Sequence, residues 1–337
     1  MSPAARLFHL RLERRAANLA PELRSALVRG YARLRLVVSD ADLETFIRSP
    51  SAERLLSETL TPPQIDAAFA PVSRALRDGV EAATKALAKD LPGAAKGVAP
   101  NPLSPQVVQG IRELNTRVMT TLGEDTRETV RAFVENGLRD GRGPKDIARG
   151  IRDILGLAPN QEAAVRNFRR MLEEGDAEAL TRLLRDRRFD GQIEKAFAGD
   201  GLSEAQIDKM TAAYRQRFVA FHAETVARTA SLDAQRLGQR LTWEDAVARG
   251  EVDGSRLTKR WSGVLDDRER PTHLAMEGET VPWDRPYSNG QDIPGDDEYN
   301  CRCLSMYSTT ATPKAGAGAK GIPTERLRVG ELLRAMP

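Results

Sequence analysis

The sequence predicts a mainly α protein in which an elongated helical N-terminal part precedes a small, irregular α+β C-terminal module. The 337 residues are rich in Ala, Leu, Arg and Glu and only 5% are aromatic, which favours helix over a β-sandwich or barrel. The composition changes after Gly238, where Gly, Asp and Pro become frequent and the helical period of apolar residues disappears. All three tryptophans, Trp243, Trp261 and Trp283, lie in this last part. These observations predict the two-part architecture.

Apolar residues recur three and four positions apart in six segments, and this period predicts a helix in each. The longest predicted helix begins with a Ser203/Gln206 capping box and ends at Gly238. Pro71 is expected to kink or split the second helix, and Gly156 to close the fifth. The six segments are residues 22–38, 63–89, 105–121, 125–139, 144–155 and 203–237.

The Pro- and Gly-rich breaks between these segments divide the chain into five predicted parts. Pro and Gly concentrate between Leu91 and Pro105, which is typical of a linker. Strands are expected at residues 257–264 and around 301–307, inside the C-terminal module. The predicted parts are a helical arm (1–90), a linker (91–105), a helical domain (106–200), the module with its long helix (201–307), and a flexible tail with a short terminal helix (308–337).

Charge and composition exclude some classes of protein. The formal net charge is +3, so the chain is not a polycation that binds nucleic acid by charge alone. No apolar stretch approaches the roughly 20 residues that cross a bilayer, and no apolar core of a secretory signal follows the N-terminus. Two cysteines, two positions apart, do not make a disulfide framework. We expect no membrane association and folding in a reducing compartment.

His273, Cys301 and Cys303 are the best metal-ligand set in the sequence. One imidazole and two thiolates suit Zn²⁺, with Asp266, Asp267 or water as the fourth ligand. Such an ion would stabilise a small module with little secondary structure. A second interpretation stays open, in which the cysteines are small buried residues and His273 hydrogen-bonds an aspartate. A Cys301–Cys303 disulfide is the least favoured interpretation, because its ring is tight.

Closely spaced charges precede this histidine. Asp266, Arg268 and Arg270 are expected to pair with one another or with Arg228 on the long helix. Catalysis by a nuclease or transferase would need paired carboxylates and a base in one cleft. Asp266, Asp267 and His273 are available for that role, but no phosphate-cradling Gly-rich loop accompanies them. The charge pattern therefore favours a structural cluster over an enzyme.

Four arginines on one predicted helix are candidates for contact with DNA phosphates. The alternative is a solvated helix face whose charges pair with neighbouring acidic residues. That alternative is favoured for the second arginine-rich stretch, residues 166–188. The candidates for DNA contact are Arg24, Arg29, Arg33 and Arg35.

Taken together, these elements resemble the phage Mu F-like minor head protein family, also described as the phage head morphogenesis domain. The family's recurring order is a helix with Ala-Arg-Thr, a Trp, Asp-x-Arg-x-Arg-x-x-His, a Gly, and Asn-Cys-Arg-Cys. The resemblance covers about residues 224–307. One departure is Ala230, which stands where the family often has an acidic residue. The matching residues are Ala227, Arg228, Thr229, Trp261, Asp266, Arg268, Arg270, His273, Gly278, Asn300, Cys301, Arg302 and Cys303.

The resemblance implies a minor head protein of a tailed bacteriophage, associated with the portal vertex and acting in head assembly, DNA packaging or DNA ejection. The implied partners are the portal protein, major capsid or scaffolding proteins and phage double-stranded DNA, with oligomers around the portal. The implied location is the virion, with the host cytoplasm during assembly. On this reading the protein is not an enzyme, and Arg228, Trp261, Asp266, Arg268, Arg270, His273, Gly278 and Asn300 hold the module together. The alternative is a nuclease or toxin-like effector that carries the same module as a packaging tag.

Overall fold

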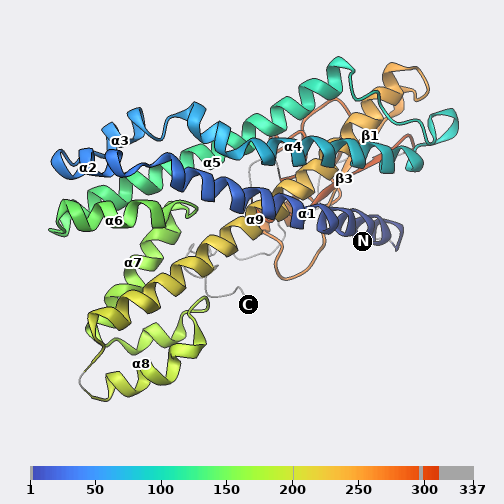
Figure 1. Ribbon diagram of the computed structural model, residues 1–337. Helices are drawn as coiled ribbons and strands as arrows, with labels where there is room; N and C mark the ends of the chain where they lie inside the picture. The colour runs from blue at the N-terminus through green and yellow to red at the C-terminus, as the bar shows by residue number, and fades with distance from the viewer. Residues whose placement is uncertain (1–2, 200, 296–298, 311–337) are drawn as a thin grey trace. The chain divides into compact units, whose positions relative to one another are not determined.

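The computed structural model describes residues 3–199, 201–295 and 299–310, and helices predominate in them (Figure 1). Three short strands form one antiparallel sheet near the C-terminal end of this part, so the predicted fold class is confirmed. The α-helices are α1 (Pro3–Val37), α2 (Asp40–Arg48), α3 (Ala52–Glu58), α4 (Pro62–Leu87), α5 (Pro105–Arg139), α6 (Pro144–Ile154), α7 (Pro159–Glu174), α8 (Asp190–Phe197), α9 (Glu204–Ala248) and α10 (Pro271–Met276).

The described residues pack as two compact units, each made of several separate segments. One unit comprises residues 3–26, 71–118, 225–295 and 299–310, and the other comprises 27–70, 119–199 and 201–224. Helices α1, α4, α5 and α9 contribute residues to both units. The sequential limits predicted at residues 90, 105, 200 and 307 therefore stay predictions of domain boundaries. The predicted tail lies outside the described residues from position 311 onward.

Several helices are longer than their periodicity predicts. Helix α1 begins at Pro3 rather than near Glu22, and α5 is one helix where two were expected. Pro71 lies inside α4, which continues on both sides of it. A proline inside a helix costs about 3 kcal/mol, but Phe69 and Val72 next to it are buried, and burial of such side chains offsets that cost.

Gly238 does not end the long helix, contrary to the prediction, and α9 continues to Ala248. A Cβ atom at position 238 would lie 2.5 Å from the Cβ of Ala83 and 3.2 Å from the backbone nitrogen of Thr84, both on α4. The absence of a side chain thus allows two helices to approach closely. The physical requirement at this position is a packing contact and not the left-handed backbone of a helix cap.

The predicted linker is packed in its first half. Two 3-10 turns, η1 (Ala88–Asp90) and η2 (Gly93–Ala95), follow α4. Leu91 and Ala95 are buried in an apolar cluster with Val252 and Leu257 from the chain after α9. This segment therefore contributes to the core of its unit.

The C-terminal module is built around the three-stranded sheet. Strand β1 (Thr258–Ser262) lies between β2 (Thr280–Pro282) and β3 (Leu304–Ser308), and it pairs antiparallel with both. The strands expected at residues 257–264 and 301–307 are confirmed as β1 and β3, whereas β2 was not predicted. In the register of the sheet, Trp261 pairs with Ser305 of β3.

Two apolar clusters hold this sheet in its unit. Leu304 of β3 packs with Leu12 and Ala16 of α1 and with Leu232 of α9. The opposite face of the sheet carries a second cluster, which consists of Trp261, Met276, Tyr287 and the two cysteines. The same strands thus connect the helical core to the residues of the candidate site. Within the part of the chain that the structure describes, no helix is long and apolar enough to span a membrane.

Candidate functional site

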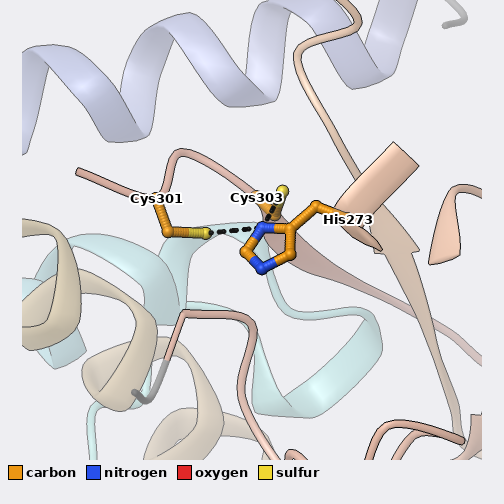
Figure 2. Close-up of side chains that lie close together, drawn as sticks. All are labelled: His273, Cys301 and Cys303. Carbon is orange, nitrogen blue, oxygen red and sulfur yellow. Dashed lines mark hydrogen bonds between the residues drawn. The ribbon is translucent and has the colours of Figure 1, made fainter. Parts of the chain in front are cut away.

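The structure brings His273, Cys301 and Cys303 together in the C-terminal module. The Nδ1 atom of His273 lies 3.5 Å from the Sγ atom of each cysteine, and the three donor atoms all lie within 4.8 Å of one another. Figure 2 shows one imidazole nitrogen of His273 facing both sulfur atoms, with a dashed line to each. All three side chains are buried. Both cysteines are free thiols, so the disulfide interpretation is wrong for this structure.

Short local elements position these three ligands. His273 lies on α10, a short helix with Pro271 in its first turn, where the missing N–H costs nothing. Cys301 and Cys303 lead into β3 from a tight bend at Asn300, whose φ is 61°. Asparagine tolerates this left-handed conformation better than most residues. The bend places two cysteines of a Cys-x-Cys sequence on the side of the chain that faces His273.

Gly295 makes room for Cys301. Its φ is 84°, which favours glycine, and a Cβ atom there would lie 2.8 Å from the Cβ and 2.9 Å from the Sγ of Cys301. A side chain at this position would therefore displace one ligand of the group.

Arg236 of α9 fixes the backbone that carries both cysteines. Its Nε donates to the carbonyl oxygen of Cys303 at 3.0 Å, and its Nη2 donates to that of Cys301 at 2.5 Å. Its Nη1 donates to the carboxylate of Asp233 at 2.8 Å, and the Arg236 side chain is 1% exposed. Burial acts to lower the pKa of this guanidinium, but the negative charges of Cys301 and Asp233 outweigh it and raise the pKa.

The two thiols are coupled. A hydrogen bond from Cys303 lowers the pKa of Cys301 against the opposing effect of burial, and His273 and Arg236 lower it further. The same contact with Cys301, together with burial, raises the pKa of Cys303. The two shifts have opposite directions, and Cys301, whose pKa is lowered, is the thiol nearer to the charge of the buried guanidinium.

Aromatic rings form the wall of the site. Trp261 is fully buried, and its ring meets those of His273 and Tyr287 edge to face, with centroids 5.4 and 5.1 Å apart. The Tyr287 hydroxyl contacts Ser305 Oγ at 2.9 Å, which gives this buried polar group a partner. The rings limit the positions that the imidazole of His273 can take.

The charged cluster exists and contains the predicted Asp266–Arg268 pair, but the main partner of Asp266 is Arg302. Asp266 makes a two-point ion pair with Arg302, with contacts of 2.8 and 2.5 Å, and a weaker one with Arg268 at 3.3 Å. Arg270 donates instead to the carbonyl oxygen of Tyr299 at 2.8 Å. Arg302 lowers the pKa of Asp266 to about 2, mainly by hydrogen bonds and against the effect of partial burial.

Arg228 and Asn300 connect α9 to the bend before the cysteines. Arg228 donates through Nε and Nη2 to the side-chain oxygen of Asn300, and the hydroxyl of Thr229 accepts from the Asn300 backbone N–H at 3.0 Å. Arg228 therefore contacts Asn300, whereas the predicted partner was Asp266. Gly278, at φ 80°, forms the turn between α10 and β2, where its N–H donates to the Trp261 carbonyl at 3.0 Å.

Neither aspartate takes the expected place of a fourth ligand. Asp266 is held by Arg302, and Asp267 is exposed to solvent. The carboxylate closest to the sulfurs is Glu269, whose Oε1 lies 3.1 Å from the Sγ of Cys303. Its other oxygen accepts from the backbone N–H of Leu265 at 2.6 Å. Gly263 accommodates this carboxylate, because a Cβ atom there would collide with it.

A surface pocket opens onto the ligand group. Glu269, His273, Cys301 and Cys303 contribute to its wall, so the group is reached from solvent although its side chains are buried. The rest of the wall is mostly polar and positively charged, because it consists of Arg268, Arg270, Asn300 and Arg302. Val264 is its apolar member.

Reasoning from sequence missed Arg236, Glu269, Gly295 and the role of Arg302. Arg236 had a usable signal, because it lies four residues after Leu232 and therefore on the apolar stripe of α9. A charged residue on a buried stripe needs partners and is a candidate for a structural centre. The partners of the other three depend on chain segments that the sequence does not bring together.

The arginines predicted to contact DNA all lie on α1, and they differ in environment. Arg24, Arg29 and Arg33 are exposed. Arg35 is half-buried, and it donates to the carbonyl oxygens of Arg152 and Leu155 at 3.2 Å each, at the end of α6. Its guanidinium thus has a structural role as a helix C-terminal cap. The first three stay predicted phosphate contacts.

Loss of the charge on Asp266 is expected to remove part of the acid sensitivity of the fold. Because the folded-state pKa is depressed from 3.8 to about 2, the ion pair adds stability that is complete above pH 3.8 and disappears as the pH falls toward 2. The side chain is 30% exposed, so solvent screening limits the contribution to about 1 kcal/mol. Unfolding midpoints of Asp266→Asn and the original chain should differ near neutral pH and converge at low pH.

The matched control is Asp267→Asn, since Asp267 is the exposed neighbour of Asp266. This variant should follow the original chain at every pH. Parallel curves for Asp266→Asn and the original chain down to the lowest pH would contradict a contribution from this ion pair.

These features define a class of protein: a mainly helical chain whose C-terminal module is held together by a buried arginine, a tryptophan and a His-Cys-Cys group. Comparison with family models identifies the module. Residues 191–306 match the family model described as Phage Mu protein F like protein, which confirms the resemblance predicted from the sequence. Comparison with curated proteins and with solved structures gives no significant match.

Proposed function

We propose that the chain is a minor head protein of a tailed bacteriophage that associates with the portal vertex and acts in head assembly, DNA packaging or DNA ejection. The observation that carries this proposal is the match of residues 191–306 to the Phage Mu F-like family. That match covers α9, β1, β2, the first residues of β3 and the His-Cys-Cys group.

The geometry of the module supports an assembly role over catalysis. Three of the motif's charged residues make contacts inside the module: Arg228 with Asn300, Asp266 with Arg302, and Arg270 with the Tyr299 carbonyl. A metal-dependent nuclease would need a pair of carboxylates and a base in one cleft. Asp266 is neutralised by an arginine and Asp267 is exposed, so these contacts serve the fold of the module.

The expected partners are the portal protein and other head components, with the virion as the final location and the host cytoplasm as the place of assembly. Contact with packaged double-stranded DNA would use the exposed arginines of α1, Arg24, Arg29 and Arg33.

The test is quantitative mass spectrometry of proheads and finished particles of the phage or prophage that encodes the chain, normalised to the portal protein. We expect a ratio to the portal near or below one. Particles assembled without portal protein are the control, and they should lack the chain. Retention in those particles would contradict the portal vertex and place the protein elsewhere in the head. Absence from proheads and finished particles alike would overturn the proposal in favour of the effector enzyme.

A further inference from the structure

The distances within the His273, Cys301 and Cys303 group match those between the ligands of a tetrahedral metal ion. With bonds of about 2.3 Å to sulfur and about 2.0–2.1 Å to nitrogen, a tetrahedral angle separates the two ligand atoms by about 3.6 Å. The two Nδ1–Sγ distances are both 3.5 Å. Both nitrogen–sulfur separations are thus those that a zinc ion requires, and the two sulfur atoms lie within 4.8 Å of each other.

A hydrogen bond from or to the imidazole nitrogen accounts for only one of its two contacts with sulfur. A single ring nitrogen has one proton to donate or one lone pair to accept with, yet two buried sulfur atoms lie at the same distance from it. One ion between the nitrogen and the sulfurs would make a full bond to each of the three atoms. Two thiolates would also balance the charge of a divalent cation.

The surroundings hold the three ligands in place independently of an ion. Arg236 fixes the carbonyl oxygens of Cys301 and Cys303, Gly295 leaves the space that Cys301 occupies, and Trp261 packs on the edge of His273. Ligands that are already ordered lose little entropy on binding, and outer contacts of this kind orient the ligands of zinc sites.

The fourth direction leads to the surface pocket. The pocket wall includes the three ligands and Glu269, so a zinc ion would enter from this side and a water molecule would complete its coordination. Glu269 Oε1 accepts from the Cys303 thiol at 3.1 Å, and loss of that proton on metal binding would leave this oxygen to accept a hydrogen bond from the water.

We propose that His273, Cys301 and Cys303 bind one Zn²⁺ ion that stabilises the C-terminal module, with a water molecule beside Glu269 as the fourth ligand. The test of zinc binding uses the purified chain, and the test of the head-protein role uses phage particles. Either proposal can therefore fail without the other.

The experiment measures bound metal in the purified full chain, produced with added zinc and then dialysed against metal-free buffer. Elemental mass spectrometry is expected to find about one zinc per chain. His273→Gln, Cys301→Ser and Cys303→Ser should each lose most of it. His222→Gln is the matched control, because His222 is also buried but contacts the Gly156 carbonyl in the other unit, and it should keep its zinc.

Cobalt gives a second readout that does not require the variants to fold. The original chain, stripped of zinc and loaded with Co²⁺, should show a thiolate-to-cobalt charge-transfer band and the intense visible bands of a tetrahedral ion. Chelation should lower the melting temperature of the original chain, and Zn²⁺ but not Mg²⁺ should restore it. A chain that holds no zinc after dialysis, gives no charge-transfer band and melts unchanged with chelator would overturn the proposal.

Discussion

Arg236→Met is expected to lower the free energy of unfolding of the unit that contains the C-terminal module by about 3–5 kcal/mol, as removal of one partner of a buried ion pair does. The Arg236 and Asp233 side chains are 1% and 9% exposed. Methionine fills much of the space but donates no hydrogen bond. The substitution therefore leaves the Asp233 carboxylate and the carbonyl oxygens of Cys301 and Cys303 without this donor.

Tryptophan fluorescence during denaturation in urea is the appropriate measurement. Trp243, Trp261 and Trp283 all belong to the unit that contains Arg236, so the signal follows that unit even where the chain unfolds in more than one step. The control is Arg249→Met, directly after the end of the same helix, whose ion pairs with Asp245 and Glu251 are partly exposed. We expect the control to lose less than about 1 kcal/mol. Equal losses in the two variants would contradict a special role for Arg236.

Trp261→Ala is expected to have an effect of the same size, about 3–5 kcal/mol, because truncation of a buried tryptophan removes apolar contacts and leaves a cavity. Trp261 is 0% exposed and contacts His273, Tyr287 and the two cysteines. The cavity would lie beside the His-Cys-Cys group. Trp261→Phe should lose less, since it keeps a ring in part of the same space.

Hydrogen exchange of the backbone amides measures this effect without relying on the removed fluorophore. In Trp261→Ala, the protected amides of β1 and β3 should exchange faster, in proportion to the lost stability. Trp283→Ala is the control, because Trp283 is only partly buried and packs against the separate cluster of Leu91 and Val252. A larger loss in the control than in Trp261→Ala would contradict the central position of Trp261.

The existence of most helices follows from the sequence, but several of their limits do not. Apolar periodicity is a local property, so it predicted the helices that became α4, α5, α6 and α9. Gly238 was predicted to be a stop signal. Its actual role depends on Ala83, about 155 residues away in the chain, and a distant packing partner leaves no trace in local composition.

In the candidate site, too, the sequence predicted the group of ligands but not all of the contacts around it. Residue chemistry selected His273, Cys301 and Cys303 as one group before their distances were known, because imidazole and thiolates are rare in this chain and have few shared uses. The pairing of the nearby charges was predicted less well. Asp266 pairs with Arg268, as predicted, but its closest contacts are with Arg302, which follows the bend at Asn300.

By itself, then, the sequence determined the helical class, the existence of β1 and β3, and the membership of the His-Cys-Cys group, which depend on local period and residue chemistry. Only the tertiary structure decided the roles of Arg236, Gly295 and Glu269. It also placed Arg35 at the end of α6. A charged or small residue has many partners available along a chain of this length, and the packing of segments far apart in sequence selects one of them.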